Sequence, residues 1–366
     1  MTSERRADGD SRAGRLPAGR FPVGLLGCGR IARLFHLPIL AAHPELELLA
    51  VAEPDPAGRA VARSTASGAE IHEDWREVVA DPRIEAVVVC LPSGIHADAA
   101  CGAFAAGKHV YLEKPVATTL EDGRRVESAW RASGAVGMAG FDQRFAAAMM
   151  ELKRELGSGS IGAPTGARLA MGSGRRDAPD WKRSRATGGG VLLDLGSHMV
   201  DLARFVLEDE VRDVQASVAS VLSDDDTASF TMTLASGILA QVWVTLAGVT
   251  ESRFEVVGER GVLLADRYAG TLRRLSPEPP WGRPDRARAG LARLGRDSRA
   301  LLAVARPLGL GTTYRSALAT FAAAVAARGL ASPDIADGVK SLEVVIAAEE
   351  SARTGRAVAV PHASPV

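Results

Sequence analysis

A glycine-rich turn between an apolar run and a helix-like segment constrains the fold of this chain more than any other feature. Phe21 to Gly27 reads as a short buried strand and leads directly into Gly27-Cys28-Gly29. Ile31 to Ala42 then carries apolar residues at helical spacing, until Pro38 is expected to interrupt the helix. With the small residue Ala32, the two glycines complete the pattern G-x-G-x-x-G/A. This order of elements predicts the first βα unit of a dinucleotide-binding fold.

The residue types in this unit suit a dinucleotide. Gly27 permits the tight turn, and Gly29 lets a pyrophosphate approach the backbone. Arg30 and Ile31 open the helix, whose unpaired N–H groups and dipole favour an anion, so both are expected to contact the cofactor. Glu53 follows a second apolar run, 24 residues after Gly29, near the usual separation of about 20. Its carboxylate is expected to accept the ribose hydroxyls; the alternative is a solvated acid at a strand end.

Glu53 also predicts which cofactor is preferred. A carboxylate repels a 2′-phosphate and hydrogen-bonds a free 2′-hydroxyl, and Pro54 stands where an NADP-preferring protein more readily places an arginine. We therefore expect NAD(H) to be preferred. NADP(H) stays possible, because Arg59 or Arg30 could reach a phosphate.

Apolar runs alternate with helical segments through the first half of the chain. The expected strands are Leu46 to Ala52, Ala86 to Leu91, His109 to Leu112 and Val136 to Gly140, and the expected helices are His96 to Ala106 and Leu120 to Ala132. The run Ala86 to Leu91 is β-branched and continuous, as expected for a strand covered on both faces. The alternation predicts the α/β class, with a doubly wound parallel sheet in a Rossmann domain over residues 21–142.

Composition argues against several classes of function. Lys plus Arg number 44 and Asp plus Glu number 44, so no net charge favours nucleic acid as a partner. No apolar run approaches the roughly 18 residues that span a membrane. Cys28, Cys90 and Cys101 match no metal-binding spacing, and we expect no metal site and reduced thiols in a cytoplasmic protein. Residues 1–20 are polar and lack an apolar signal segment, which predicts a disordered tail.

Further motifs follow in a fixed order. They are Leu91 to His96, Gly107 to Pro115 with its Glu-Lys-Pro ending, Phe141 to Phe145, Gly188 to His198 with its Gly-Gly-Gly and Asp-x-x-x-His elements, and Ser351 to Arg356. Each motif alone is ordinary, but the ordered set resembles the Gfo/Idh/MocA family of sugar and cyclitol dehydrogenases over roughly Phe21 to Val360. The family often has Thr-Pro-Asn in the first of these segments, so Leu91 and Ser93 are departures.

The resemblance implies a hydride transfer between NAD(P) and a secondary alcohol or ketone of a sugar, cyclitol or sugar derivative. It also implies an α+β domain over residues 143–366, with an open, mostly antiparallel sheet that binds substrate and joins a homo-oligomer. Its final helices are expected to pack back on the first domain. The sequence agrees, because strand-like runs with partial alternation occur at Val211 to Leu222, Thr227 to Leu234, Ile238 to Leu246 and Arg253 to Val257.

Lys114, Asp194 and His198 are the candidate catalytic residues. Lys114 follows an apolar strand that Pro115 ends, which places a cation at the carboxyl end of the parallel sheet, where open α/β folds bind ligands. Asp194 and His198 share one helix face among apolar neighbours. The resemblance implies that His198 accepts the substrate's hydroxyl proton, Lys114 stabilises the alkoxide, and Asp194 binds substrate or fixes the imidazole. Asp201 is an alternative partner for the imidazole. An exposed lysine and a surface ion pair are the alternatives without function.

Other positions are weaker candidates. Pro92, Glu113 and Lys114 stand in family-like segments and are expected near the cofactor. His96 either approaches the nicotinamide or only begins its helix. Arg144 either lines the substrate site or makes an ion pair between domains. The remaining candidates for covering the substrate, with simple packing as the alternative, are Trp181, Lys182 and Tyr314.

Two further functions stay open. A non-catalytic sensor that binds NAD(P) would not need Lys114, Asp194 and His198 together. A glycosidase that uses tightly held NAD in a transient oxidation is compatible with the same first domain. The Arg-rich stretch from Ser276 to Thr313 is either a solvated loop with a short helix or a lid for an anionic group on the substrate.

Overall fold

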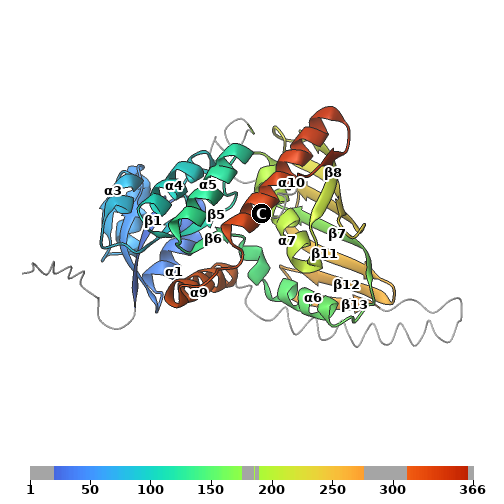
Figure 1. Ribbon diagram of the computed structural model, residues 1–366, viewed down its shortest axis with the longest axis horizontal. Coiled ribbons are helices and arrows are strands. Elements are labelled where there is room, and N and C mark those ends of the chain that lie inside the picture. The colour runs from blue at the N-terminus through green and yellow to red at the C-terminus, as the bar shows by residue number, and fades with distance from the viewer. Residues whose placement is uncertain (1–19, 175–184, 186–188, 276–310, 362–366) are drawn as a thin grey trace, which may run out of the picture.

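The structure is a computed structural model that describes residues 20–174, 185, 189–275 and 311–361. Within these ranges the chain forms two sheets that lie side by side, with helix α10 (Ile335–Thr354) between them (Figure 1). The predicted tail lies outside the described residues except for Arg20. The Arg20 guanidinium donates to the carbonyls of His43 and Leu46 at 2.9 and 2.7 Å, so Arg20 belongs to the folded domain rather than to a tail.

Six parallel strands form the first sheet, in the order β3-β2-β1-β4-β5-β6. The strands are β1 (Phe21–Leu26), β2 (Leu46–Ala52), β3 (Glu70–His72), β4 (Ala86–Val89), β5 (His109–Glu113) and β6 (Gly137–Gly140). This is the strand order of a Rossmann sheet, and it confirms the predicted fold class of the first domain. The carboxyl ends of β1, β2, β4 and β5 consequently meet at one edge.

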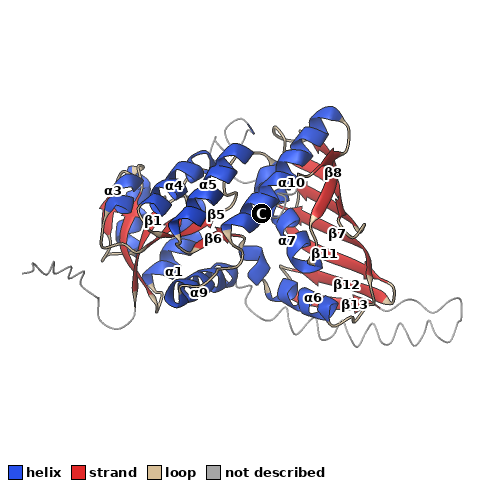
Figure 2. Ribbon diagram, viewed as in Figure 1, coloured by secondary structure: helices blue, strands red, loops and turns tan. Residues whose placement is uncertain are grey.

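Helices cover both faces of the parallel sheet (Figures 1 and 2). Those on one face are α3 (Trp75–Ala80), α4 (His96–Ala105) and α5 (Leu120–Ser133), and those on the other are α1 (Leu37–Ala41), α2 (Pro56–Thr65) and α9 (Thr312–Ala327). Helix α9 comes from the end of the chain, yet Phe321 packs edge-on against Tyr111 of β5, with ring centroids 5.9 Å apart. A late segment thus completes the layer over β5.

Local signals fix the ends of these helices. The Asp55 carboxylate accepts hydrogen bonds from the N–H groups of Ala57 and Gly58 at the start of α2. Thr119 caps α5 in the same way, and Gly134, with a φ of 65°, ends it in a left-handed conformation that glycine adopts without strain. The sequence analysis predicted α5 but left out α2, β3 and α3.

The prediction that Pro38 interrupts the first helix is wrong. The helical segment runs on to Ala41, and Pro38 lies in the first turn of α1. A π turn, η1 (Ala32–His36), comes directly before it. At this π turn the Leu37 N–H bonds to the Ala32 carbonyl, five residues back rather than four, and this local change in the hydrogen-bond pattern accommodates the proline.

Eight strands form the second sheet, in the order β13-β12-β11-β7-β10-β9-β8-β14. The strands are β7 (Pro164–Gly172), β8 (Val211–Ala219), β9 (Thr227–Leu234), β10 (Leu239–Thr245), β11 (Glu251–Gly258), β12 (Gly261–Asp266), β13 (Thr271–Leu275) and β14 (Val358–Ala359). Only β7 and β10 pair in parallel, so the expected mostly antiparallel sheet is confirmed. Gly237, with a φ of 91°, turns the β9–β10 hairpin.

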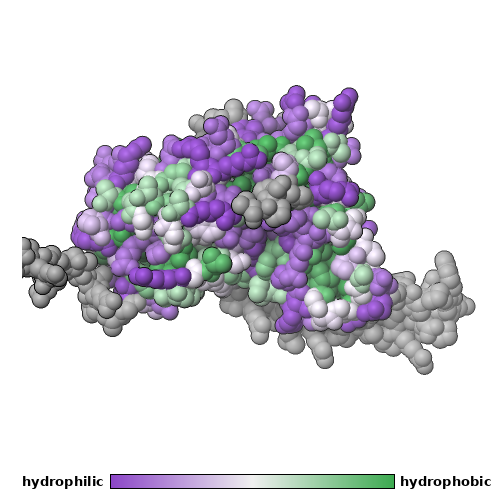
Figure 3. All heavy atoms as spheres, viewed as in Figure 1, coloured by the Kyte–Doolittle hydropathy of each residue, from purple (hydrophilic) through white to green (hydrophobic). Residues whose placement is uncertain are grey.

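Helices α6 (Ala147–Gly157), α7 (Ser197–Leu207) and α10 pack against this second sheet (Figure 1). Helix α10 also contacts α5 and β6, so it joins the two halves through one continuous core. On the face drawn in Figure 3, charged and apolar side chains are interspersed. None of the helices in the described ranges is long and apolar enough to cross a membrane.

Candidate active site

The glycine-rich turn has the shape that a pyrophosphate requires. Gly27 has a φ of 91°, and a Cβ at this position would lie 2.7 Å from the carbonyl oxygen of Cys90. A Cβ at Gly29 would meet no atom within 4 Å, so the space beside Gly29 is open. Arg30 and Ile31 begin the helix that follows. The turn therefore offers an open approach to helical N–H groups, as the motif predicts.

Glu53 lies at the same edge and faces this turn. One carboxylate oxygen accepts a hydrogen bond from the Cys28 N–H at 2.6 Å, and the other accepts from the Asp55 N–H at 2.9 Å. Gly58 makes room for the side chain, because a Cβ there would lie 2.6 Å from the Glu53 Cγ. Each carboxylate oxygen has a second lone pair for a hydroxyl. The residues at this site thus fit the adenosine ribose of a dinucleotide.

Arg59 is engaged away from this site. Its guanidinium donates to the carbonyls of Glu53 and Pro54 at 3.1 and 2.7 Å, and pairs with Glu73 at 2.7 Å. Arg30 is exposed at the start of the first helix. Of the two arginines that could reach a 2′-phosphate, Arg59 is thus bound to the backbone that follows β2, whereas Arg30 makes no such contact with that backbone.

Glu113 connects the first helix to the Glu-Lys-Pro segment. Its Oε1 lies 2.7 Å from the Nε2 of His36, and both side chains are buried. Its Oε2 accepts from the Lys114 N–H at 3.2 Å. The sequence analysis missed His36, whose partner is 77 residues away. Its place on the cofactor helix was the only available signal.

Lys114 and Asp194 meet between the two domains. The Lys114 Nζ donates to the Asp194 carboxylate at 2.8 Å and to the Asp194 carbonyl at 2.7 Å. Asp194 lies in a π turn, η6 (Leu192–Gly196), directly before α7. Such turns are frequent at functional sites, and the first helix carries another at η1. An ammonium has three N–H donors, and two of those of Lys114 are used in these contacts. Among the described residues, the third N–H is left to donate to a substrate oxygen.

His198 lies one turn further along, in the first turn of α7. Its side chain is largely buried, and its imidazole meets the Phe141 ring edge-on with centroids 6.1 Å apart. Phe141 follows β6 at the carboxyl edge of the parallel sheet. The three candidate catalytic residues therefore gather where the second domain meets this edge.

Two of the weaker candidates, His96 and Tyr314, make specific contacts within the fold. Both ring nitrogens of His96 face backbone carbonyls, of Pro115 at 2.7 Å and Leu91 at 2.8 Å, and burial lowers the pKa of His96. His96 thus begins α4 and contacts the two loops that contain Leu91 and Pro115. Tyr314 stacks on Phe35 at 4.4 Å, as the packing alternative expects. Pro92 is exposed at the carboxyl edge, where a cofactor contact is possible.

Arg144 forms an ion pair, which was one of the two interpretations that the sequence left open. Its guanidinium binds both carboxylate oxygens of Asp201, at 2.8 and 2.6 Å, and Asp337 at 3.1 Å. Both oxygens of Asp201, the alternative partner of the His198 imidazole, thus face Arg144. Trp181 and Lys182 lie outside the described residues, as does most of the Arg-rich stretch. Within the described ranges, no three His, Cys, Asp or Glu side chains gather as a metal-binding group.

Comparison with known proteins identifies the family. Residues 21–141 match the oxidoreductase family with an NAD-binding Rossmann fold, and residues 149–264 match the Gfo/Idh/MocA C-terminal domain. The chain belongs to the Gfo/Idh/MocA family. A 1,5-anhydro-D-fructose reductase of Ensifer adhaerens is 30% identical to it over 92% of this chain and 98% of the relative. An inositol 2-dehydrogenase of Rhizobium meliloti is 32% identical over 66% of this chain and 74% of the relative.

Solved structures agree on the fold. A levoglucosan dehydrogenase in complex with NADH and L-sorbose superposes with a TM-score of 0.80, over 94% of this Gfo/Idh/MocA chain and all of that chain, at 24% identity. Membership of the family makes the chain an NAD(P)-dependent oxidoreductase, and its relatives include sugar and cyclitol dehydrogenases. The family and function predicted from the ordered motifs are thereby confirmed.

Proposed function

We propose that this enzyme transfers a hydride between NAD(P) and a secondary alcohol or ketone of a sugar or cyclitol, with Lys114, Asp194 and His198 as its catalytic residues. The observation that carries this proposal is the contact of Lys114 with Asp194 at the carboxyl edge of the parallel sheet. The same edge carries the glycine-rich turn after β1, Glu53 after β2 and Pro92 after β4. Open α/β sheets bind cofactor and substrate there.

Each catalytic residue has a separate task in alcohol oxidation. NAD(P), bound at the glycine-rich turn, would supply the hydride acceptor. His198 takes the proton from the substrate hydroxyl, since an imidazole suits proton transfer near neutral pH. Lys114 directs its remaining donor at the same oxygen and stabilises the alkoxide charge. Asp194 holds the Lys114 ammonium in place through its carboxylate and its carbonyl.

Glu53 supports NAD(H) as the preferred cofactor. Its carboxylate is fixed by the Cys28 and Asp55 N–H groups beside the turn, where a 2′-phosphate would be repelled. Arg59 is held by backbone carbonyls and Glu73 and does not offset this charge. NADP(H) binding would then depend on Arg30.

A homo-oligomer is proposed through the second sheet. The outward side of β10 exposes Leu239 and Trp243, at 52% and 41% of their surface, on a face that α6, α7 and α10 do not cover. A second copy of the chain would bury these side chains. Cys28, Cys90 and Cys101 are all free thiols, which suits work in the cytoplasm.

The proposed function is tested by following cofactor absorbance with NAD and NADP against polyols, cyclitols, sugars and sugar nucleotides. We expect turnover with at least one member of this panel and its loss in His198→Ala. A wild-type protein that binds NAD but oxidises or reduces none of them would contradict the proposal and favour a sensor. Release of the aglycone from a glycoside, without net cofactor change, would favour the glycosidase.

A further inference from the structure

One short segment contacts the helix of the catalytic histidine at two points. Phe141, directly after β6, meets the His198 ring edge-on at 6.1 Å. Three residues later, Arg144 binds both carboxylate oxygens of Asp201, which lies one turn beyond His198 on α7. The segment directly follows β6, an edge strand of the parallel sheet, whereas α7 packs on the second sheet.

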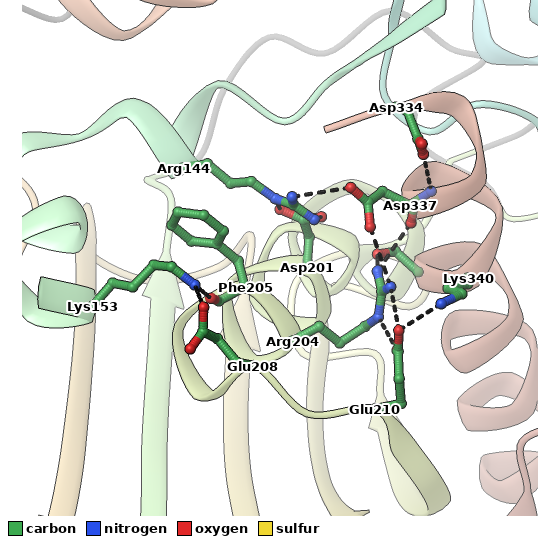
Figure 4. Close-up of polar contacts among 11 residues, drawn as sticks. Arg144, Lys153, Asp201, Arg204, Phe205, Glu208, Glu210, Asp334, Asp337 and Lys340 are labelled. Atoms are coloured by element: carbon green, nitrogen blue, oxygen red, sulfur yellow. Dashed lines mark hydrogen bonds and ion pairs between the residues drawn. The ribbon is translucent and has the colours of Figure 1, made fainter. Parts of the chain in front are cut away.

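The second point is part of a larger ion network (Figure 4). Asp337 of α10 accepts from Arg144 at 3.1 Å and from Arg204 at 3.4 Å. Arg204 in turn binds Glu210 at 2.6 and 3.1 Å. Asp201 is 1% exposed, Arg144 is 6% exposed and Arg204 is 7% exposed. Helix α7 is therefore tied at once to the end of β6 and to α10.

Burial makes the Arg144–Asp201 contact sensitive to geometry. A bidentate arginine–carboxylate pair fixes the direction as well as the distance between two groups. Two such groups, taken out of water, stay favourable only while their hydrogen bonds are complete. The pair therefore restrains α7 against sliding or rotating over the end of β6.

We propose that Arg144 is a positioning residue, which holds α7 through Asp201 so that His198 stays over Phe141 at the carboxyl edge of the parallel sheet. Arg144 acts through Asp201 and does not touch the reacting atoms. This role rests on the proposed function of His198. The Arg144–Asp201 ion pair would then affect turnover as well as stability.

Lys153 of α6 offers a matched control, because it contacts the same helix α7. Its Nζ binds the Phe205 carbonyl at 2.7 Å and lies 4.5 Å from the Phe205 ring centroid, and the Arg144 guanidinium lies 5.0 Å from that ring. Both cations thus hold α7, but Lys153 does so at the end away from His198. Lys153→Met should cost stability without changing the position of His198.

The test compares Arg144→Met, Arg144→Lys, Lys153→Met and the double variant Arg144→Met/Asp201→Asn. Arg144→Met should lower kcat roughly 10- to 100-fold while KM and the dissociation constant of NAD stay within about twofold, because small misplacement of a catalytic group is costly. Arg144→Lys should recover part of kcat, since it keeps the charge but not the bidentate geometry. Lys153→Met should keep kcat.

The double variant separates position from charge. It removes the unpaired carboxylate that Arg144→Met leaves buried, so it should regain thermal stability. If kcat of the double variant stays low, Arg144 positions α7. If kcat returns to the wild-type value, the positioning role is overturned. This variant also keeps the test valid where Arg144→Met fails to fold.

A readout without turnover tests the inference independently of the reaction. The imidazole of His198 is followed by NMR across a pH titration in each variant. In Arg144→Met, the Asp201 charge one turn away is no longer balanced by Arg144 and should move the midpoint to higher pH, and Lys153→Met should not move it. Asp337 and Arg204, the other charges in this network, are unchanged in all variants. An identical midpoint in Arg144→Met and Lys153→Met would overturn the inference, even if the proposed reaction itself proved wrong.

Discussion

The Lys114 Nζ donates a hydrogen bond to the Asp194 Oδ1 at 2.8 Å, although the two residues lie 80 positions apart in the chain. Removing the ammonium in Lys114→Met should lower turnover about 10²- to 10³-fold, because it removes the charge beside the developing alkoxide. Asp194→Asn should lose less, since its carbonyl still holds Lys114. Steady-state kinetics and NAD titration on folded variants check this. NAD affinity should stay unchanged, and near wild-type turnover would contradict the role of Lys114.

His198→Ala should lower turnover by roughly 10²- to 10⁴-fold, the range of general acid–base help. Alcohol oxidation by the wild type should rise with pH as the imidazole loses its proton, and this limb should vanish in the variant. In Lys114→Met/His198→Ala the losses should be less than additive if both residues act as one unit. Circular dichroism of each variant is the control for folding. A retained acidic limb in His198→Ala would assign the base elsewhere.

Glu53→Ala should narrow the gap between NAD and NADP affinity. The variant loses both the acceptor for a ribose hydroxyl and the charge that repels a 2′-phosphate. Titration of each cofactor by intrinsic fluorescence measures the two dissociation constants. Arg30→Ala is the matched variant, expected to weaken NADP binding more than NAD binding. Wild-type protein that binds NADP as tightly as NAD would show the preference to be wrong.

The His36–Glu113 pair should contribute to stability. His36→Ala leaves the buried Glu113 carboxylate without its partner, which costs about 3 kcal/mol of unfolding free energy. His36→Gln should recover part of this, because an amide can donate to the same oxygen. Chemical denaturation compares the variants. Equal stability of His36→Ala and wild type would show that the 2.7 Å contact contributes nothing.

Glu210 should make stability depend on acid pH. Burial alone would raise its pKa, but Arg204 and Lys340 outweigh burial and lower the pKa to about 2. Since the folded-state pKa lies below the ordinary value of 4.5, the stabilisation is complete above that pH and is lost as the pH falls toward 2. Glu210→Gln should cost roughly 1 kcal/mol at pH 7, because solvent screens a side chain that is 37% exposed.

The pH dependence is measured as the difference in unfolding free energy between Glu210→Gln and wild type. This difference should shrink when the pH is lowered from 7 toward 3. A difference that stays constant over this range would show that the folded-state pKa of Glu210 is not lowered.

Local patterns predicted much of the first domain. Buried parallel strands such as Ala86–Val89 are continuous β-branched runs, and a cap and a glycine bound α5, so short-range chemistry sufficed there. Strand β7 was missed because Pro164–Gly172 contains two glycines, two alanines and one proline among its nine residues and shows little β propensity. It becomes a central strand only through pairing with β10 and β11.

The sequence by itself determined the glycine-rich turn, the acid after β2 and the placement of Lys114 after a parallel strand, because each depends on neighbours a few residues away. Only the tertiary structure decided which partners the charged side chains take. Spacing alone places Asp201 one turn from His198, but it did not predict that Arg144, 57 residues earlier, binds both Asp201 oxygens. Such contacts depend on how the second domain docks against the first. Helical and strand periodicity set which face a side chain occupies, whereas packing between distant segments sets what it meets there.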